Sequence, residues 1–307
     1  MRVVVLSGGI GGGRFCVGMA EAAGPERLTV VGNVGDDVDV LGLHVSPDLD
    51  SVLYALAGLS DEVRGWGRAD ETWNALETAA ALGGESWFRL GDRDIGLHLV
   101  RADALRRGEP LSAVTARLAA ALGVRSRILP ATDDRLRTFV AVAGGELAFQ
   151  EWFVGRQHRD ETLGVRFEGA DAARPAPGVG EALAAADLIV VAPSNPYISI
   201  LPILAVAEIR AALERRRVPC VAVSPLIGGK AIKGPAADML RALAGGAEPA
   251  HVAGCYPGLV DALVIDDADA AAAAAVEALG VRAVVVPTLM RDAAARRALA
   301  DAVLALA

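Results

Sequence analysis

Short apolar runs rich in β-branched residues recur along this chain, and each is bounded by turn-forming residues. Their continuous apolar character is typical of parallel strands that are buried on both faces. Long helical patterns such as 198–217 lie between them, and this alternation predicts a Rossmann-like, doubly wound α/β fold with a mostly parallel sheet. The predicted strands are 2–6, 28–34, 186–194, 218–225, 262–267 and 282–288.

The middle of the chain departs from this alternation. Residues 51–125 are mostly helix-forming, and we interpret them as a helical insertion into one α/β domain that spans 1–307. The segment 138–154 has the pattern of a β-hairpin that turns at Gly144-Gly145. The alanine-rich run 268–279 is expected to be a helix, because a strand-like run follows it.

Composition excludes several classes of protein. The 307 residues are 53% hydrophobic and 22% charged, which is incompatible with a disordered chain. The net charge of −8 gives no electrostatic reason to bind nucleic acid or an anionic membrane. Prolines or charges interrupt both long apolar stretches, 188–207 and 269–286, so we expect no membrane span.

The three cysteines also restrict the possibilities. Cys16, Cys220 and Cys255 are odd in number and far apart, so they fit neither a disulfide framework nor a C-x-x-C metal site. The N-terminal apolar run stops at Ser7 and is too short for a signal-peptide core. We expect a cytoplasmic protein, and we expect it to form a homodimer.

A glycine-rich loop, SGGIGGGRF (7–15), follows the first predicted strand and opens a helix. Glycines let the backbone approach a phosphate, and the start of a helix offers unpaired N–H groups. Arg14 replaces the third glycine of the dinucleotide fingerprint, and Arg14-Phe15 replaces the Lys-Ser/Thr pair of the P-loop. The loop therefore predicts a phosphate site of neither standard kind, and the simpler alternative is a tight strand-to-helix turn.

Acidic residues crowd the segment 33–50, which follows the second predicted strand. Ligands of open α/β sheets bind at such strand ends, and several carboxylates beside a phosphate loop indicate a hard cation, namely Mg²⁺. The alternative is helix capping together with solvated turns. The acidic residues are Asp36, Asp37, Asp39, Asp48 and Asp50.

Three further segments carry polar residues that suit a ligand. WFRLGDRDIGLHL (87–99) is a charged loop, although its charges can also pair with one another. APSNPYISILP (192–202) follows a buried strand and presents Ser194 and Asn195. SPLIGGKAIKGPA (224–236) offers glycine amides and two lysines for anion binding. No H-x-x-x-H pair indicates zinc, and no G-x-S-x-G elbow is present.

Taken together and in order, these motifs resemble the 2-phospho-L-lactate transferase (CofD) family of coenzyme F-420 biosynthesis. The similarity covers nearly the whole chain and is closest to the bacterial branch, which leans towards phosphoenolpyruvyl transfer. The segments that also match are RGWGRADETWNALE (64–77), ILPATDDRLRT (128–138), FQEWFV (149–154) and PAPGVGEAL (175–183).

The resemblance implies a transferase for substituted phosphate groups. Such an enzyme moves the phospho-acid half of a guanylyl-activated three-carbon acid to the ribityl hydroxyl of the deazaflavin Fo, releases GMP and uses Mg²⁺. An alcohol that attacks a phosphoanhydride needs charge neutralised on the phosphate oxygens, and amides, a metal and cations supply this.

The resemblance also assigns residues to roles. Asp50 and Arg89 match positions that hold Fo, and Asp50 is the candidate base. Asp36 matches a magnesium-associated acid with a role in catalysis, with Asp48 or Asp50 as a second metal ligand. The residues expected to face the guanine nucleotide are Gly8, Gly9, Gly11, Gly12, Gly13, Asn195, Gly229, Lys230 and Lys233.

The chain departs from the family pattern at two places. Leu201 replaces a glycine in a Ser-Ile-Gly-Pro sequence, and 155–158 carries fewer arginines than usual. Arg156 and the Lys230/Lys233 loop are the candidates for binding the acid's carboxylate. Phosphoenolpyruvyl, phospholactyl and phosphoglyceryl donors all stay open, with phosphoenolpyruvyl favoured by the branch resemblance.

Two other functions compete with this one. A bacterial branch with the same fold binds nucleotide sugars and regulates cell-wall metabolism without catalysis. That branch has ADDGGSSG after its second strand, whereas this chain has GDDVDVLG and retains SPDLD. A nicotinamide dehydrogenase is disfavoured by the missing third glycine.

Overall fold

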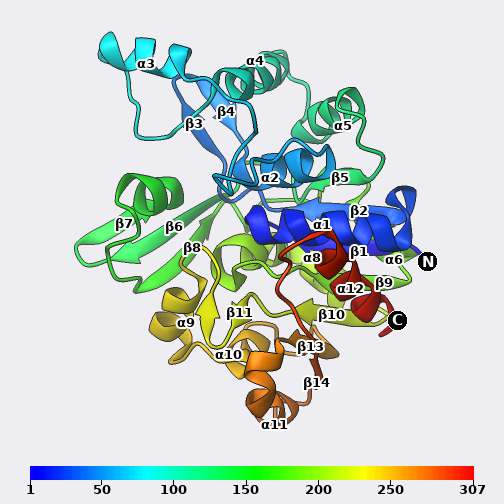
Figure 1. Cartoon of the computed structure of the whole chain (residues 1–307). Coiled ribbons are helices and arrows are strands. Elements are labelled where there is room, and N and C mark those ends of the chain that lie inside the picture. Colours follow the sequence, from blue (N-terminus) through cyan, green and yellow to red (C-terminus); the bar gives the residue numbers. More distant parts are fainter.

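The computed structural model describes residues 1–307, and its centre is a parallel seven-stranded sheet (Figure 1). Every neighbouring pair of strands in this sheet runs parallel, as the apolar runs predict. The strands in spatial order are β14 (Arg282–Val285), β13 (Ala262–Ile265), β10 (Cys220–Val223), β9 (Leu188–Val191), β1 (Val3–Ser7), β2 (Leu28–Gly32) and β5 (Arg127–Pro130).

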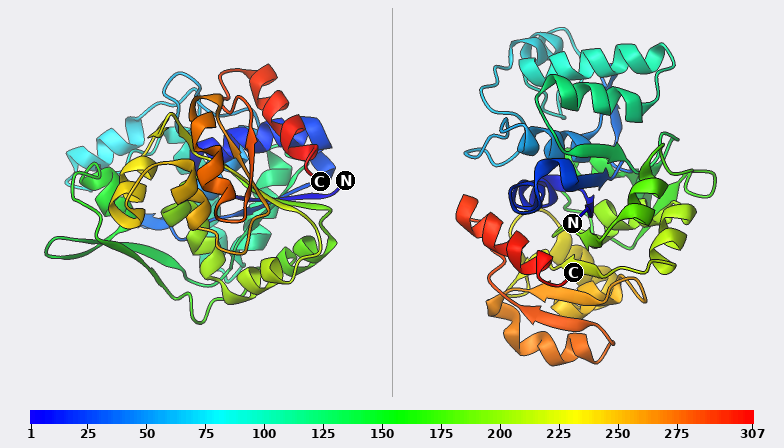
Figure 2. Two further views of the ribbon diagram at one scale, coloured as in Figure 1. Left: turned by 90° about the horizontal axis from the view of Figure 1, so that it is seen from below. Right: turned by 90° about the vertical axis from the view of Figure 1, so that its right-hand side faces the viewer.

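The strand order defines where the chain reverses direction across the sheet. β1 leads through α1 to β2 on one side, and β9 leads to β10 on the other, so β1 and β9 lie at the switch point. Because crossovers between parallel strands are right-handed as a rule, this order is expected to place helices on both faces. In Figure 2, α1 (Gly9–Ala23) and α12 (Ala293–Leu304) cover one face, and α6 (Val179–Ala185) and α8 (Ala207–Glu214) cover the other. Both termini lie on the same side of the molecule (Figures 1 and 2).

The chain leaves the sheet after β2 and returns at β5, and this excursion is mostly helical. It also contains a short antiparallel hairpin of β3 (Val38–Val40) and β4 (Leu43–Val45) that the sequence did not predict. The single α/β domain itself stays a prediction. The helices of the excursion are α2 (Pro47–Leu56), α3 (Asn74–Ala81), α4 (Asp92–Arg106) and α5 (Leu111–Ala121).

A small antiparallel sheet stands beside the central one (Figure 1) and is built from β6 (Arg137–Val142), β7 (Gly145–Ala148) and β8 (Gly164–Glu168). The hairpin at Gly144-Gly145 is confirmed, but its predicted end at 154 is wrong. Residues 151–155 form a π-helical turn, η2 (Glu151–Gly155), because Phe149 and Trp152 turn inward onto Ile198 and Met239.

The remaining elements complete the C-terminal half. The predicted helix 198–217 is broken, since its first part and α8 meet at 91°. The predicted helix 268–279 is a 3-10 segment followed by one short α-helix. These elements are η1 (Pro25–Arg27), η3 (Pro196–Ile200), α7 (Leu201–Ala205), β11 (Leu226–Ile227), β12 (Lys230–Ala231), α9 (Ala236–Ala244), α10 (Pro249–Gly254), η4 (Asp267–Ala272) and α11 (Ala273–Glu277).

All three cysteines are free, as expected. No single helix is both long and apolar enough to cross a membrane, although the bent pair Pro196–Ala205 and Ala207–Glu214 passes that test by length and composition.

Candidate active site

The glycine loop lies at the switch point, beside the turn that follows β9. The Ser194 hydroxyl donates to the Gly8 carbonyl over 2.7 Å and accepts from the Gly8 amide over 3.2 Å. Two segments far apart in sequence thus meet at the carboxyl ends of adjacent strands. This is the position at which open α/β sheets bind their ligands.

Close packing explains why the loop consists of glycines. A Cβ on Gly11 would lie 2.9 Å from the Pro193 carbonyl oxygen, and one on Gly13 would lie 2.9 Å from the Ser51 carbonyl oxygen. A Cβ on Gly8 would collide with the Asp48 carboxylate. The backbone of α1 therefore approaches both the turn after β9 and the start of α2. In the first turn of α1, the amides of residues 10 and 11 have no acceptor within the helix, which suits a phosphate.

Two buried carboxylates share one amide nitrogen beside this loop. Asn33 Nδ2 lies 2.9 Å from Asp36 Oδ1 and 2.9 Å from Asp48 Oδ2. Asp48 Oδ1 also accepts from the Gly9 amide over 2.7 Å. Asp36 is 4% exposed and Asp48 is 5% exposed. One polar residue thus holds two acidic side chains against the first turn of α1.

The protonation of this pair is unusual. Burial, followed by the charge of Asp48, raises the pKa of Asp36 well above its ordinary value. Burial also raises the pKa of Asp48 to about 6, although hydrogen bonds from Asn33, Gly9 and Ser199 oppose that rise. Two carboxylates that repel each other in a buried place are a favourable environment for a cation.

These residues fit Mg²⁺. Magnesium in nucleotide enzymes is usually bound by one or two carboxylates and completed by water and substrate phosphates. Asp36 and Asp48 supply such carboxylates next to amides that suit a phosphate. The structure contains no cluster of three or more His, Cys, Asp or Glu side chains that would enclose a metal alone. It does not bring Asp50 into the pair.

Asp50 instead makes an ion pair with Arg101 of α4. Arg101 Nη1 donates to Asp50 Oδ2 over 2.9 Å, and Nη2 donates to Asp50 Oδ1. The Ser46 amide adds a bond of 3.3 Å to Oδ2. The side chains of Arg101 and Asp50 are only 1% and 6% exposed. Both oxygens of this carboxylate already accept hydrogen bonds within the protein. This argues against the two predicted roles of Asp50, as a base and as a metal ligand.

The ion pair belongs to a chain of buried polar groups along one face of α4. His98 Nδ1 accepts from Arg101 over 3.1 Å, and His98 Nε2 lies 3.2 Å from Asp94 Oδ1. Tyr54 of α2 donates to the same oxygen of Asp94. Burial opposes ionisation of Asp94, but His98 and Tyr54 outweigh it and lower the pKa of that carboxyl. The network fastens α2, and with it Asp48, to α4.

Arg89 lies on the surface, three residues before α4 begins. Its guanidinium carbon stands 4.6 Å from the centre of the Trp73 ring, a cation–π distance. The side chain is exposed and can reach a ligand. Of the two residues that the resemblance assigns to one substrate, Arg89 is therefore exposed, whereas Asp50 is buried in an ion pair.

The 224–236 segment is placed differently from the prediction. The amides of Gly228 and Gly229 donate to the two carboxylate oxygens of Asp269, over 2.9 and 3.1 Å. These amides already have an acceptor within the protein, which argues against the prediction that they bind a phosphate. Lys230 is exposed, and Lys233 Nζ donates to the Gly65 carbonyl over 3.0 Å.

Two other predicted residues have partners within the protein. Asn195 Oδ1 accepts from the Tyr197 amide and begins η3, and its Nδ2 points at Met239 Sδ. Arg156 lies 3.8 Å from Glu151 and 3.6 Å from Asp160. These acids weaken the case for Arg156 as a carboxylate ligand.

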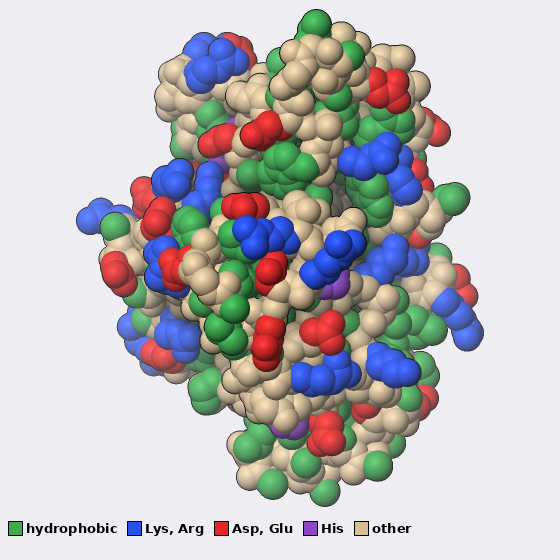
Figure 3. Space-filling model, turned by 90° about the vertical axis from the view of Figure 1, so that its left-hand side faces the viewer, with side chains coloured by type: hydrophobic (Ala, Val, Ile, Leu, Met, Phe, Trp, Pro, Cys, Tyr) green, Lys and Arg blue, Asp and Glu red, His purple; other side chains and the backbone are tan.

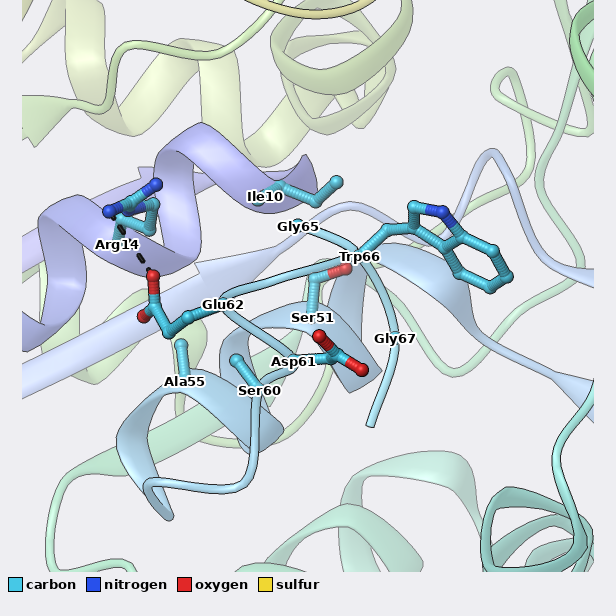
Figure 4. A pocket seen from close by; sticks show the side chains of 10 residues that line it. All are labelled: Ile10, Arg14, Ser51, Ala55, Ser60, Asp61, Glu62, Gly65, Trp66 and Gly67. Atoms are coloured by element: carbon cyan, nitrogen blue, oxygen red, sulfur yellow. Dashed lines mark ion pairs between the residues drawn. The ribbon is translucent and has the colours of Figure 1, made fainter. Parts of the chain in front are cut away.

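A cavity lies between α1, α2 and the loop that follows α2 (Figure 4). Arg14 stands in its wall and pairs with Glu62 at 3.3 Å. The face shown in Figure 3 carries acidic and basic side chains interspersed. The residues that line the cavity are Ile10, Arg14, Ser51, Ala55, Ser60, Asp61, Glu62, Gly65, Trp66 and Gly67.

Sequence reasoning missed the residues that position the acids. Asn33 is fully buried, and Gln150 of the FQEWFV segment donates to the Asp36 carbonyl over 3.3 Å. The 94, 98 and 101 spacing places three polar groups on one helix face, a signal that was available. Their partners on α2 lie about forty to fifty residues earlier, and spacing alone does not reveal such pairs.

The fold is that of an α/β protein, and its switch point carries a glycine loop and two buried carboxylates that suit a phosphorylated substrate. A model of the family 2-phospho-L-lactate transferase CofD matches residues 3–296, and the chain belongs to that family. It is a transferase of coenzyme F-420 biosynthesis that moves a phospho-acid group. The regulator alternative is not favoured.

Known proteins are similar over the whole length. The phosphoenolpyruvate transferase of Streptomyces griseus is 47% identical and covers 100% of this chain and 98% of its own. That of Mycolicibacterium smegmatis is 40% identical and covers 100% and 99%. Protein BH3568 from Bacillus halodurans has the same fold, with a TM-score of 0.66, 20% identity and 99% of both chains covered.

Proposed function

We propose that the chain transfers the phosphoenolpyruvyl group of a guanylyl-activated donor to the ribityl hydroxyl of the deazaflavin Fo. The hydroxyl oxygen bonds to the phosphorus of the phospho-acid, the phosphoanhydride bridge breaks, GMP leaves, and the hydroxyl proton is released. The carboxylate pair on Asn33, set against the start of α1, carries this proposal. The relatives named phosphoenolpyruvate transferase support the choice of acid.

Each part of the site has a role in this reaction. Asp36 and Asp48 hold Mg²⁺, which neutralises charge on the phosphate oxygens when it is bound. The free amides at the start of α1 bind a phosphate of the donor. Arg89 contacts Fo, and the Arg101–Asp50 pair positions α2. Positioning of two substrates supplies much of the rate enhancement.

The choice of acid is tested by competition. Phosphoenolpyruvyl and phospholactyl groups differ by two hydrogens, so the pocket is expected to discriminate only modestly between them, by analogy with about 1–3 kcal/mol for one methylene. The enzyme is incubated with Fo, Mg²⁺ and equal amounts of the enolpyruvyl, lactyl and glyceryl donors, and the products are weighed by mass spectrometry. A predominant enolpyruvyl product supports the proposal, and a product that carries only phosphoglycerate contradicts it.

We further propose that the enzyme is a homodimer and is cytoplasmic. Light scattering on the purified protein and fractionation of cells test these two points. A monomer in solution or a membrane-bound enzyme would contradict them.

A further inference from the structure

Trp66 stands at the tip of a tightly fastened loop that follows α2. Gly65 and Gly67 flank it with φ values of 73° and 68°, a backbone region that favours glycine. Asp61 Oδ1 accepts from the amides of residues 63 and 64, and its other oxygen lies 2.9 Å from the Arg64 guanidinium. The loop therefore holds Trp66 in a defined place.

Arginine and tryptophan side chains alternate in a stack that packs against one face of the Trp66 ring. The Arg64 guanidinium carbon lies 4.9 Å from the Trp66 ring centre and 5.1 Å from that of Trp73. The two rings are 6.3 Å apart and inclined at 54°. Arg89 completes the series at 4.6 Å from Trp73. Such contacts fix the rings through attraction between the cations and the ring faces.

Reciprocal hydrogen bonds join the starts of α3 and α4, the two helices beside Trp73 and Arg89. Asp92, at the start of α4, accepts from the amides of Asn74 and Ala75 at the start of α3. Glu71, just before α3, accepts in turn from the amides of residues 93 and 94 in the first turn of α4. Trp73 and Arg89 thus lie on two segments that hold each other in place.

The Trp66 side chain is partly exposed to solvent. The residue is 39% exposed, and it lies at the edge of a cavity of about 30 Å³ that Ile10 of α1 and Ser51 of α2 also line (Figure 4). That cavity is too small for a heterocycle, so the exposed ring face itself is the surface offered to a ligand. Lys233 reaches the same loop from the other half of the molecule and binds the Gly65 carbonyl. An exposed aromatic face, fixed from behind and placed beside the start of α1, is suited to stack on a planar ring.

We propose that Trp66 is the stacking surface for the deazaflavin ring of the acceptor, an assignment that rests on the proposed function. Both substrates carry a planar heterocycle, the deazaflavin of Fo and the guanine of the donor. Arg89, our proposed contact for Fo, belongs to the same stack. Asn195, proposed for the nucleotide, instead points its amide towards α9. Lys233, which the resemblance assigns to the nucleotide, also reaches this loop. The choice of the deazaflavin therefore rests on Arg89, and separate titrations of the two ligands test it.

The test compares Trp66→Ala and Trp66→Phe with the wild type. Val63→Ala is the matched control, because Val63 lies in the same loop and is fully exposed at 100%. Fo and GDP are titrated separately and followed by Fo fluorescence and by calorimetry. Loss of one stacked ring is expected to raise the Kd for Fo roughly tenfold to a hundredfold in Trp66→Ala. Trp66→Phe keeps most of the affinity, and Val63→Ala keeps all of it.

The GDP titration separates the two rings. Unchanged GDP affinity in Trp66→Ala, together with weakened Fo binding, supports the assignment. Weakened GDP binding with normal Fo binding would show that guanine covers Trp66, and it would overturn the assignment. Normal binding of both ligands would overturn stacking on Trp66 altogether.

The proposed function is checked on the wild type alone. Tight Fo binding that depends on Trp66, without any GMP release from the three donors, would remove the proposed transfer and leave the stacking surface standing. A wild-type protein that binds no Fo would remove both.

Discussion

Arg101 donates to both carboxylate oxygens of Asp50, which lies 51 residues earlier in the chain. Burial alone would lower the pKa of Arg101, but the charge and hydrogen bond of Asp50 raise it overall. Each charge is therefore stabilised by the other in a place that water does not reach. The pair ties the first turn of α2, which carries Asp48, to the middle of α4.

Removing one partner of this pair is expected to be costly. Arg101→Met leaves the Asp50 carboxylate buried and uncompensated, and we expect the free energy of unfolding to fall by about 3–5 kcal/mol. Urea denaturation followed by circular dichroism measures this. The double variant Asp50→Asn/Arg101→Met, which leaves no buried charge, should recover part of the loss. A single variant as stable as the wild type would contradict a buried ion pair.

Asp36→Asn separates function from stability. The substitution keeps the shape of the side chain but removes a charge that burial and Asp48 disfavour, so the melting temperature should stay the same or rise. Turnover should fall by about a hundredfold or more, because the site loses a carboxylate that would hold Mg²⁺, and with it the cation that neutralises charge on the phosphate oxygens. GMP release and a thermal melt measure the two effects. A large drop in melting temperature with normal turnover would show a structural role instead.

The carboxylate pair also predicts how pH and Mg²⁺ act together. The pKa of Asp48 is raised to about 6 in the folded protein, so the stability associated with this group is present below its unfolded pKa of about 4 and is lost as pH rises through 6. The raised pKa of Asp36 acts in the same direction. Without metal, these two groups therefore make the protein less stable as pH rises.

Mg²⁺ binds the charged carboxylates and should reverse that loss. We expect the rise in melting temperature on adding Mg²⁺ to be larger at about pH 8 than at about pH 5. Differential scanning fluorimetry in both buffers measures it, and Asp48→Asn serves as the control in which the rise shrinks. Equal stabilisation at both pH values would argue against this pair as the metal site.

The glycines of α1 differ from other helical glycines in what surrounds them. Gly13→Ala places a Cβ against the Ser51 carbonyl oxygen and should destabilise the protein and reduce activity by pushing α1 away from α2. Gly96→Ala in α4 meets nothing within 4 Å and should instead stabilise the protein, by about 0.5–1 kcal/mol. Denaturation of both variants tests the contrast. Equal effects would mean that the contact with α2 does not matter.

Much of the fold was predictable because burial on both faces gives parallel strands a distinctive apolar pattern. All six predicted strands lie in the central sheet. β5 was missed because it is a short edge strand of four residues that ends in a proline. β8 was missed because its charged and half-buried residues alternate without a clear apolar face.

The site was only partly predictable. The structure brings the predicted glycine loop, Asp36 and Asp48 together, because each follows or faces a strand end. The sequence did not reveal that the Gly228 and Gly229 amides donate hydrogen bonds to the Asp269 carboxylate, because Asp269 lies about 40 residues further along the chain. Asn33 was overlooked because an asparagine in a turn has many simpler explanations. Long-range pairing decides which polar groups are free for a ligand, and local sequence does not encode it.

The central claim is transfer to Fo with release of GMP. The most direct measurement mixes the purified enzyme, Fo, the guanylyl-activated enolpyruvyl donor and Mg²⁺, and follows GMP and the deazaflavin product by chromatography and mass spectrometry. We predict one GMP for each Fo that gains the phosphoenolpyruvyl group, and no reaction in excess chelator. Absence of GMP with all substrates present, or full activity in excess chelator, would contradict the account.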